Sequence, residues 1–357
     1  MNVMNSQSHN YSSGFLERSQ IPFPLHPKGD WWPWKSLDNS YRDISECTPS
    51  PPPSVSIIVP TFNCGLYLEE SVRSLLLQDY PYLQIIVVDG GSTDGTQHIL
   101  EHYHSVLDIV ISEPDDGQAD AINKGFDMCI GDYVNWLNAD DMLAPNALRS
   151  IFSPKTVYAN IIAGRVQNIN DSTPPEAVGM PTINRGFTPQ NFLYGVGNIP
   201  FKVDFCYHQP GVFLMRAMIN QIGSLNPGYR YIFDQEYMIR VMSIGPHVTY
   251  VDHIVAFFRL RPGSKTVSES RGFIQEVDMM QHLLIGCPSS KVSAFRVRNA
   301  IQARKWYDKI SGLHKNGSQL RDIISIVFLM SINPAVRFNR FTLGYVVQSI
   351  KRLMANN

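Results

Sequence analysis

Cysteine is scarce and scattered in this sequence. The 357 residues contain five, which are Cys47, Cys64, Cys129, Cys206 and Cys287. The number is odd and no two of them form a C-x-x-C pair, so neither a disulfide framework nor a zinc site is predicted. A reduced, cytoplasmic setting is therefore expected.

Long hydrophobic runs are missing as well. The first residues, MNVMNSQSHNYSSGF, lack the basic start and apolar core of a secretory signal. The longest apolar run near the C-terminus, from Ile323 to Ile332, contains two serines and falls well short of the roughly 20 residues that a spanning helix needs. We expect neither a signal peptide nor a membrane-spanning segment.

Net charge is almost absent, at −1, but the charges are unevenly distributed. Residues 288–357 contain 12 Lys and Arg against 2 Asp and Glu, which leaves 18 basic and 29 acidic residues in the first 287. This asymmetry predicts a tail that meets an anionic surface, either a membrane or the acidic body of the same protein. No nucleic-acid partner is expected.

Three segments differ in composition. Residues 1–53 are polar and rich in proline and serine, and they contain the aromatic stretch DWWPWKS. We interpret them as an extended arm that either docks through its tryptophans or forms a disordered leader. Residues 54–287 are predicted to form the main folded domain, with halves at 54–145 and 146–287, and residues 288–357 a basic helical extension.

Strand and helix patterns alternate from residue 54 onward. SVSIIVPT is a β-branched run that predicts a strand buried on both faces, and the following GLYLEESVRSLLLQD has apolar residues at helical spacing. Short turns connect these elements, which favours a mostly parallel, doubly wound α/β sheet. Further strands are predicted at 83–90, 108–114 and 132–138, and further helices from Ser92, at 119–128 and at 234–243.

Polar clusters follow the predicted strands where each strand ends. The most unusual is the run Asn138-Ala139-Asp140-Asp141, in which two carboxylates are adjacent. Ligands of parallel α/β sheets bind outside the carboxyl ends of the strands. A ligand cleft is therefore predicted at this edge.

Five stretches together resemble the inverting family-two glycosyltransferases, which have the glycosyltransferase A-type fold. They are SIIVPTFN, IIVVDGGSTDGT, DDGQADAINKG, WLNADD and FDQEYMIRV, and they occur in the family's order between Ser54 and Thr266. The resemblance implies transfer of a sugar from a nucleotide-sugar, a UDP-sugar by expectation, to a carbohydrate or lipid-linked acceptor in polysaccharide or glycolipid biosynthesis. It also implies a Mg²⁺ or Mn²⁺ cofactor and an enzyme in the cytoplasm, at the inner membrane face if the extension binds lipid.

The resemblance also assigns candidate residues. Asp234 is the expected general base, with Glu236 as the runner-up, because an attacking hydroxyl must lose a proton. Asp140 and Asp141 are the expected metal ligands, since a cation relieves the repulsion between carboxylate and diphosphate. The donor is expected to contact Pro60, Thr61, Asn63, Asp89, Gln118, Asp120, Asn138, Ala139 and Asp140. The acceptor side is expected to involve His208, Gln209 and Glu236. The flexible loop that closes over the diphosphate is expected to contain Arg259, Arg261, Ser264 and Lys265.

Two departures from the family pattern leave alternatives open. Asn138 stands where the family usually has aspartate, and Gly90 follows Asp89 where a second aspartate is common. A nucleotide-sugar-binding protein with a weakened active site therefore remains an alternative. A nucleotidyltransferase-like enzyme is another, although SIIVPTFNCG has none of the basic residues that a phosphate loop would need.

Overall fold

The computed structural model describes residues 3–4, 18–34, 51–153, 155–195, 205–262, 270–286, 297–298 and 301. Contacts divide the chain into two compact units. The first contains residues 1–185, 206–237 and 245–270, and the second contains residues 186–205, 238–244 and 271–357. Nearly all of the predicted basic extension, and Ser264 and Lys265 of the predicted loop, lie outside the described residues.

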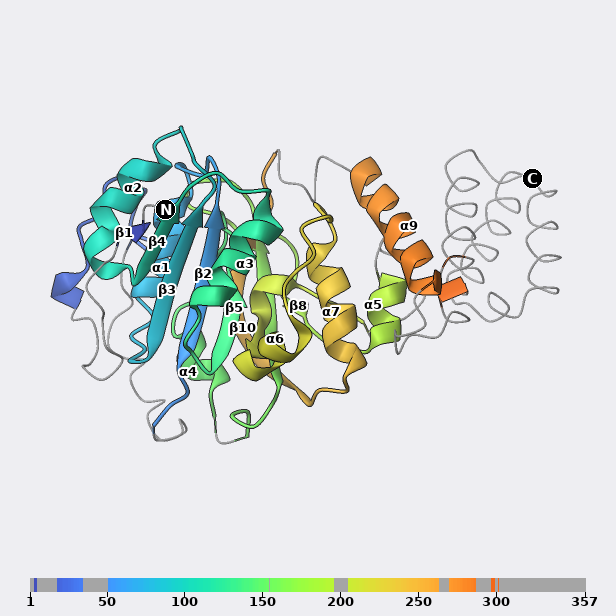
Figure 1. The fold of residues 1–357 in the computed structure, drawn as a ribbon. Helices are drawn as coiled ribbons and strands as arrows, with labels where there is room; N and C mark the ends of the chain where they lie inside the picture. The colour runs from blue at the N-terminus through green and yellow to red at the C-terminus, as the bar shows by residue number, and fades with distance from the viewer. Residues whose placement is uncertain are drawn as a thin grey trace, which may run out of the picture. The chain divides into compact units, whose positions relative to one another are not determined.

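The first unit is built on one mixed sheet with the strand order β1-β4-β3-β2-β5-β9-β7-β10-β6, and β8 pairs with β7. Strands β4, β3, β2 and β5 are parallel neighbours, as are β7 and β10. The predicted α/β fold with a run of parallel strands is confirmed (Figure 1). The strands are β1 (Val3–Met4), β2 (Val55–Thr61), β3 (Leu83–Asp89), β4 (Ile109–Ser112), β5 (Tyr133–Trp136), β6 (Met142–Leu143), β7 (Ile161–Ile169), β8 (Thr182–Ile183), β9 (Val212–Met215) and β10 (Val248–Arg259).

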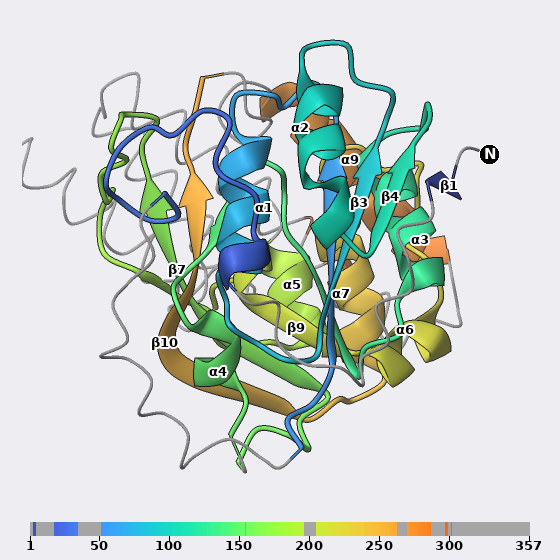
Figure 2. The same cartoon turned by 90° about the vertical axis from the view of Figure 1, so that its left-hand side faces the viewer.

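Helices cover both faces of the parallel strands. The core cluster joins Val55, Ile57 and Val59 of β2 to residues of α1 (Leu68–Leu76) and α2 (Thr96–Tyr103). On the opposite face, the Cα atom of Gly125 in α3 (Gln118–Met128) packs closely against Ile58. Successive residues of a strand point to opposite faces, so β2 supplies both layers. Figure 2 shows α1 and α2 on one side of these strands and α3 on the other.

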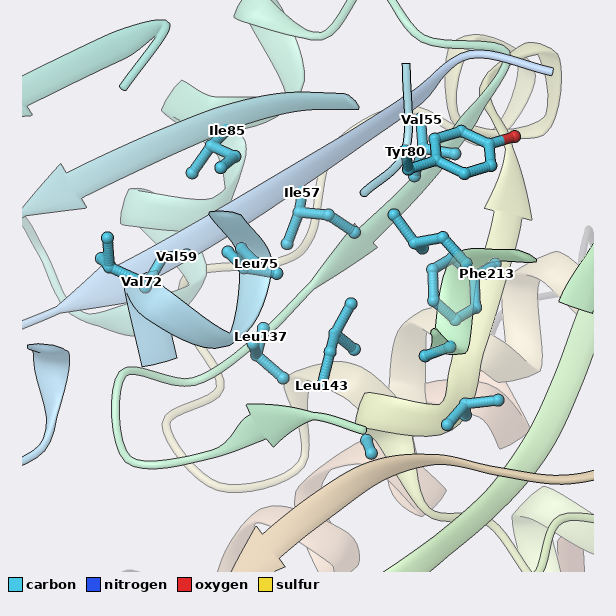
Figure 3. Close-up of a cluster of buried hydrophobic side chains, with 14 of the residues drawn as sticks. Val55, Ile57, Val59, Val72, Leu75, Tyr80, Ile85, Leu137, Leu143 and Phe213 are labelled. Atoms are coloured by element: carbon cyan, nitrogen blue, oxygen red, sulfur yellow. The ribbon is translucent and has the colours of Figure 1, made fainter. Parts of the chain in front are cut away.

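The core of the first unit continues from the parallel strands into the antiparallel ones. In Figure 3, Leu75 of α1 lies near Ile57, and Leu137 and Leu143 extend the cluster toward Phe213 of β9. All four of these leucine and phenylalanine side chains are essentially inaccessible to solvent. The strand ends that carry the candidate residues therefore project from a rigid, well-packed base.

The remaining helices follow the parallel half. In the first unit these are α4 (Ala147–Ile151) and α6 (Arg216–Ile222), together with the 3₁₀ turns Arg18–Gln20, His104–Val106 and Gln209–Gly211. The second unit contains α5 (Pro189–Gly195) and nearly all of α9 (Ser270–Gly286), while α7 (Phe233–Ser243) contributes to both units. Among the helices that the structure describes, none is both long enough and apolar enough to cross a bilayer.

Residues 18–34 of the N-terminal arm pack against α1. The Trp32 indole donates to the carbonyl of Leu143 at 2.9 Å, and the Arg73 guanidinium lies over the Trp34 ring at 5.8 Å. The carboxylate of Glu69 accepts the backbone N–H groups of Leu25 and His26. The arm thus covers the polar face of α1, which explains why the charged Glu69 and Arg73 side chains are buried.

One predicted boundary is wrong. The helix expected from Ser92 begins at Thr96, because Gly95 adopts a φ of 97°, outside the helical region. Ser92 instead turns back onto Asp89, to which it donates its backbone N–H. Asp94 supports the true helix start, since its carboxylate accepts the Thr96 N–H at 3.2 Å.

Candidate functional site

The turn after β5 separates its two adjacent carboxylates. Asp140 reaches partly to solvent and pairs with Arg261, whose Nε lies 2.7 Å from Asp140 Oδ2. Asp141 is 1% exposed and points into the protein. Burial, and after it the neighbouring charge of Asp140, raises the pKa of Asp141 well above its usual range. Only Asp140 is thus available to a ligand.

Asn138 links this turn to α3. Its amide Nδ2 donates to Asp141 Oδ2 at 3.0 Å, while its Oδ1 accepts from the Gln118 amide at 2.6 Å. Both ends of the Asn138 amide are therefore engaged within the protein. This arrangement uses a donor and an acceptor at once, which an ionised aspartate cannot supply.

Arg259, at the end of β10, fixes the other side of the turn. Its backbone N–H donates to Asp141 Oδ1 at 3.0 Å, and its Nε donates to the Asp140 carbonyl at 3.1 Å. Its guanidinium pairs with Glu70, and both side chains are 2% exposed. Tyr67 lies against the guanidinium groups of both Arg259 and Arg261, at 5.2 and 5.0 Å from its ring centre. This network holds Arg261 beside Asp140. Two of its members, Tyr67 and Glu70, were not among the predicted site residues.

Asp89 is fully buried at the end of β3. Its Oδ2 accepts from the Ser112 hydroxyl at 2.7 Å, and both of its oxygens lie 3.2 Å from the Ser92 nitrogen. The Ser92 hydroxyl also donates to Asp89 Oδ1. These bonds tie β3 to β4 and to the following turn. The predicted contact of Asp89 with the base stays a prediction.

The first predicted nucleotide-facing turn, after β2, is tied to the turn after β3. Asn63 has a φ of 50°; its N–H donates to the Ser92 hydroxyl at 2.7 Å, and its Oδ1 accepts from Thr93 N–H at 2.9 Å. Pro60 and Thr61 are buried in β2, where Thr61 aligns with Asp89. The structure thus brings the ends of β2 and β3 together as predicted, while the Asn63 side chain supports the turn.

The start of α3 carries the other predicted donor residues. Gln118 begins the helix and reaches Asn138, as described above. Asp120 accepts the Asp116 N–H at 3.2 Å and lies 3.6 Å from Lys124, which also pairs with Glu113 at 3.1 Å. Ile122 is fully buried. Lys124 is thus held among carboxylates.

His208 and Gln209 lie beside the same edge, between β8 and β9. The Gln209 amide donates to the Trp136 carbonyl at 2.6 Å, at the last residue of β5. His208 is held by its backbone to the Asn184 side chain, and its ring packs on Phe258 with centres 4.6 Å apart. Burial lowers the pKa of His208 to about 4, so the ring is neutral at neutral pH.

Asp234 and Glu236 lie half-buried in the first turn of α7. Burial, followed by the negative charge and hydrogen bonding of Asp234, raises the pKa of Tyr207 well above its usual range. One turn further along, the Tyr237 ring packs against Trp136 of β5 at 6.5 Å. The helix start is therefore anchored to the strand that leads into Asp140.

Asp140 is a suitable ligand for a divalent cation in this region. Within the described part of the chain, no three His, Cys, Asp or Glu side chains converge on a point. Mg²⁺ commonly uses one or two carboxylates, with substrate phosphates and waters completing its shell. Asp140 fits that role. The geometry does not support Asp141 as a metal ligand, because its two oxygens accept hydrogen bonds from Arg259 and Asn138 in the interior.

Asp140 and Arg261 follow the carboxyl ends of β5 and β10, and α/β sheets bind their ligands outside the carboxyl ends of parallel strands. The crystal structure of S. aureus TarS residues 1–349 in complex with UDP-GlcNAc superposes with a TM-score of 0.54, covering 79% of this chain and 81% of that one. The two sequences are 18% identical, so this likeness concerns the fold alone.

Sequence comparisons find similarity to glycosyltransferases. Residues 56–208 match the model of Glycosyl transferase family 2. A PGL/p-HBAD biosynthesis glycosyltransferase of Mycobacterium bovis is 29% identical over 239 residues, which cover 65% of this chain and 86% of the relative. Glycosyltransferase GlyG of Streptococcus pneumoniae is 30% identical over 122 residues, or 33% of this chain and 40% of that one. The chain is thus similar to the glycosyltransferases of family 2 over residues 56–208, and to these two named glycosyltransferases.

Proposed function

We propose that the chain is a family-two glycosyltransferase that transfers a sugar, with inversion, from a UDP-sugar. The acceptor is a hydroxyl of a carbohydrate or of a lipid-linked molecule. The reaction belongs to the assembly of a polysaccharide or glycolipid. The observation that carries the proposal is the pairing of Asp140 with Arg261 at the carboxyl end of β5. A cation-binding carboxylate beside a phosphate-binding guanidinium suits a nucleoside diphosphate leaving group. The mycobacterial relative named as a PGL/p-HBAD biosynthesis glycosyltransferase supports a role in biosynthesis of this kind.

The residues divide the work as follows. Asp140 would hold Mg²⁺ or Mn²⁺, which when bound supplies positive charge to the diphosphate. Arg261 is placed to exchange its partner from Asp140 to a phosphate oxygen, and the Tyr67 ring keeps its guanidinium at the site. Asp234 accepts the proton of the attacking hydroxyl, and its helix start lies against β5 through Tyr237.

A nucleotide-release assay tests the proposal. The full-length chain with Mn²⁺ should release UDP from at least one member of a panel of UDP-sugars when an acceptor extract is present. Asp140→Asn should lower that release by about 100-fold or more, because the leaving group loses its charge compensation. Absence of release from every donor by the wild-type chain would refute the proposal.

Contact with an anionic membrane through residues 288–357 is a separate proposal, supported by their 12 basic residues. Flotation with anionic vesicles should carry the full chain upward, and a chain ending at residue 287 should stay behind. Equal flotation of both chains would favour the alternative, in which the basic tail packs on the acidic body.

A further inference from the structure

Gly90 leaves an opening in the turn after β3, and a carboxylate from a different strand end fills it. A Cβ atom on Gly90 would lie 2.6 Å from Asp115 Oδ2 and 3.0 Å from Asp115 Cγ. That approach is far closer than van der Waals contact, so the glycine is required for Asp115 to occupy this position. The Gly90 N–H donates to the Thr61 carbonyl at 3.0 Å, which places the opening at the joint end of β2 and β3.

Asp115 has one engaged and one available oxygen. Its Oδ1 accepts the Gly117 N–H at 2.8 Å. Within the described part of the chain, no hydrogen bond is formed by Oδ2, which faces Gly90. The side chain is only half-buried, and burial raises its pKa above the usual range. A donor that approached Oδ2 would therefore meet a desolvated acceptor, where a charge-assisted hydrogen bond is strong.

Asp89 is less suited to receive a base. It has no solvent exposure, and its two oxygens already accept from Ser92 and Ser112. A base that bonded to Asp89 would have to compete with these donors. The Asp115 carboxylate lies near Asp89. Its Oδ2 is an available acceptor, whereas both oxygens of Asp89 already accept hydrogen bonds from the protein.

We infer that Asp115, whose position depends on Gly90, accepts the ring N–H of the donor's base through Oδ2 and thereby selects uracil over cytosine. The inference rests on the proposed function. Uracil presents an N–H donor at ring position 3, whereas cytosine presents a lone pair there and would be repelled by a carboxylate. Asp115 is thus a specificity-determining residue for the nucleotide.

Binding measurements with UDP, CDP and pyrophosphate test this inference on the full-length chain with Mg²⁺, by calorimetry. Asp115→Asn should weaken UDP binding by about 10- to 100-fold and bring the affinities for UDP and CDP close together. Pyrophosphate binding should be unchanged, because it lacks the base. Asp116→Asn is the matched control, since its neighbouring side chain is exposed and should give wild-type values.

A second variant leaves Asp115 itself intact. Gly90→Ala places a methyl group where the carboxylate lies, so it should displace Asp115 and reproduce the loss of UDP affinity and of UDP preference. Wild-type affinity and preference in both variants would overturn the inference, and continued UDP release by the wild-type chain would leave the proposed function standing. A wild-type chain that binds neither UDP nor CDP would overturn both.

Discussion

Arg259 donates its backbone N–H to Asp141 Oδ1 at 3.0 Å, so the last residue of β10 holds the buried carboxylate of the turn after β5. The same arginine donates through Nε to the carbonyl of Asp140. The two adjacent aspartates are thereby separated: Asp141 is fixed in the interior, and Asp140 is left beside Arg261. The candidate site depends on this separation, because one carboxylate stabilises the turn and the other is free to meet a ligand.

Removing Glu70 should destabilise the protein strongly. Its carboxylate pairs with the buried Arg259 and with Lys28 of the arm. Glu70→Ala removes the carboxylate that pairs with the buried Arg259 guanidinium and leaves Asp171 at 3.6 Å, so the free energy of unfolding should fall by about 3–5 kcal/mol. Urea denaturation measures this free energy of unfolding. Lys28→Met, at a partly exposed partner, should cost less than about 1 kcal/mol, and equal losses in the two variants would refute the argument.

Placing an aspartate at position 138, where the family usually has one, should not stabilise this protein. In Asn138→Asp, the Nδ2 donor to Asp141 becomes an oxygen, and two carboxylates then face each other in the interior. The free energy of unfolding should fall by about 1–3 kcal/mol at neutral pH, and by less in acid, where a shared proton restores the hydrogen bond. Asn63→Asp is the control, because Asn63 supplies its Oδ1 to Thr93 N–H and an aspartate can do the same. A loss that does not change with pH would contradict this account.

Much of the fold could be predicted because its signals are local. The β-branched run of β2 is buried on both faces, and the apolar spacing of Leu68, Val72 and Leu75 places α1 against it. Polar clusters after β5 and β3 marked the edge where the ligand site was expected. These features follow from residue periodicity within a short stretch, which needs no knowledge of distant partners.

The features that could not be predicted depend on contacts between segments that are distant in the sequence. The helical periodicity of α1 does not reveal that Glu69 and Arg73 are covered by residues 18–34. Nor does the sequence reveal that the Asp141 side chain is held in the interior, because its partner Arg259 lies more than a hundred positions away. The approach of Asp115 to Gly90 joins two strand ends that only the folded sheet brings together.

Substituting the proposed base should separate catalysis from binding. Asp234→Asn keeps the size of the side chain but removes its ability to take a proton, so kcat should fall by about 10²–10⁴-fold. The Kd of the donor should stay within about twofold, because the base faces the acceptor. Glu236→Gln, two residues along the same helix, is the matched control and should retain most activity. If Glu236→Gln loses activity while Asp234→Asn keeps it, the base is Glu236.

The buried imidazole of His208 should make stability dependent on pH. Its pKa is about 4 in the folded protein, against about 6.5 in the unfolded chain. Between these values the unfolded chain binds a proton that the folded protein does not, so the free energy of unfolding falls as the pH is lowered, by at most about 3 kcal/mol. His208→Gln should reduce the difference in stability between pH 7 and pH 5, as measured by urea denaturation at both values. The exposed His98→Gln serves as the control, and a His208→Gln variant with the full wild-type dependence would show that other groups cause the acid sensitivity.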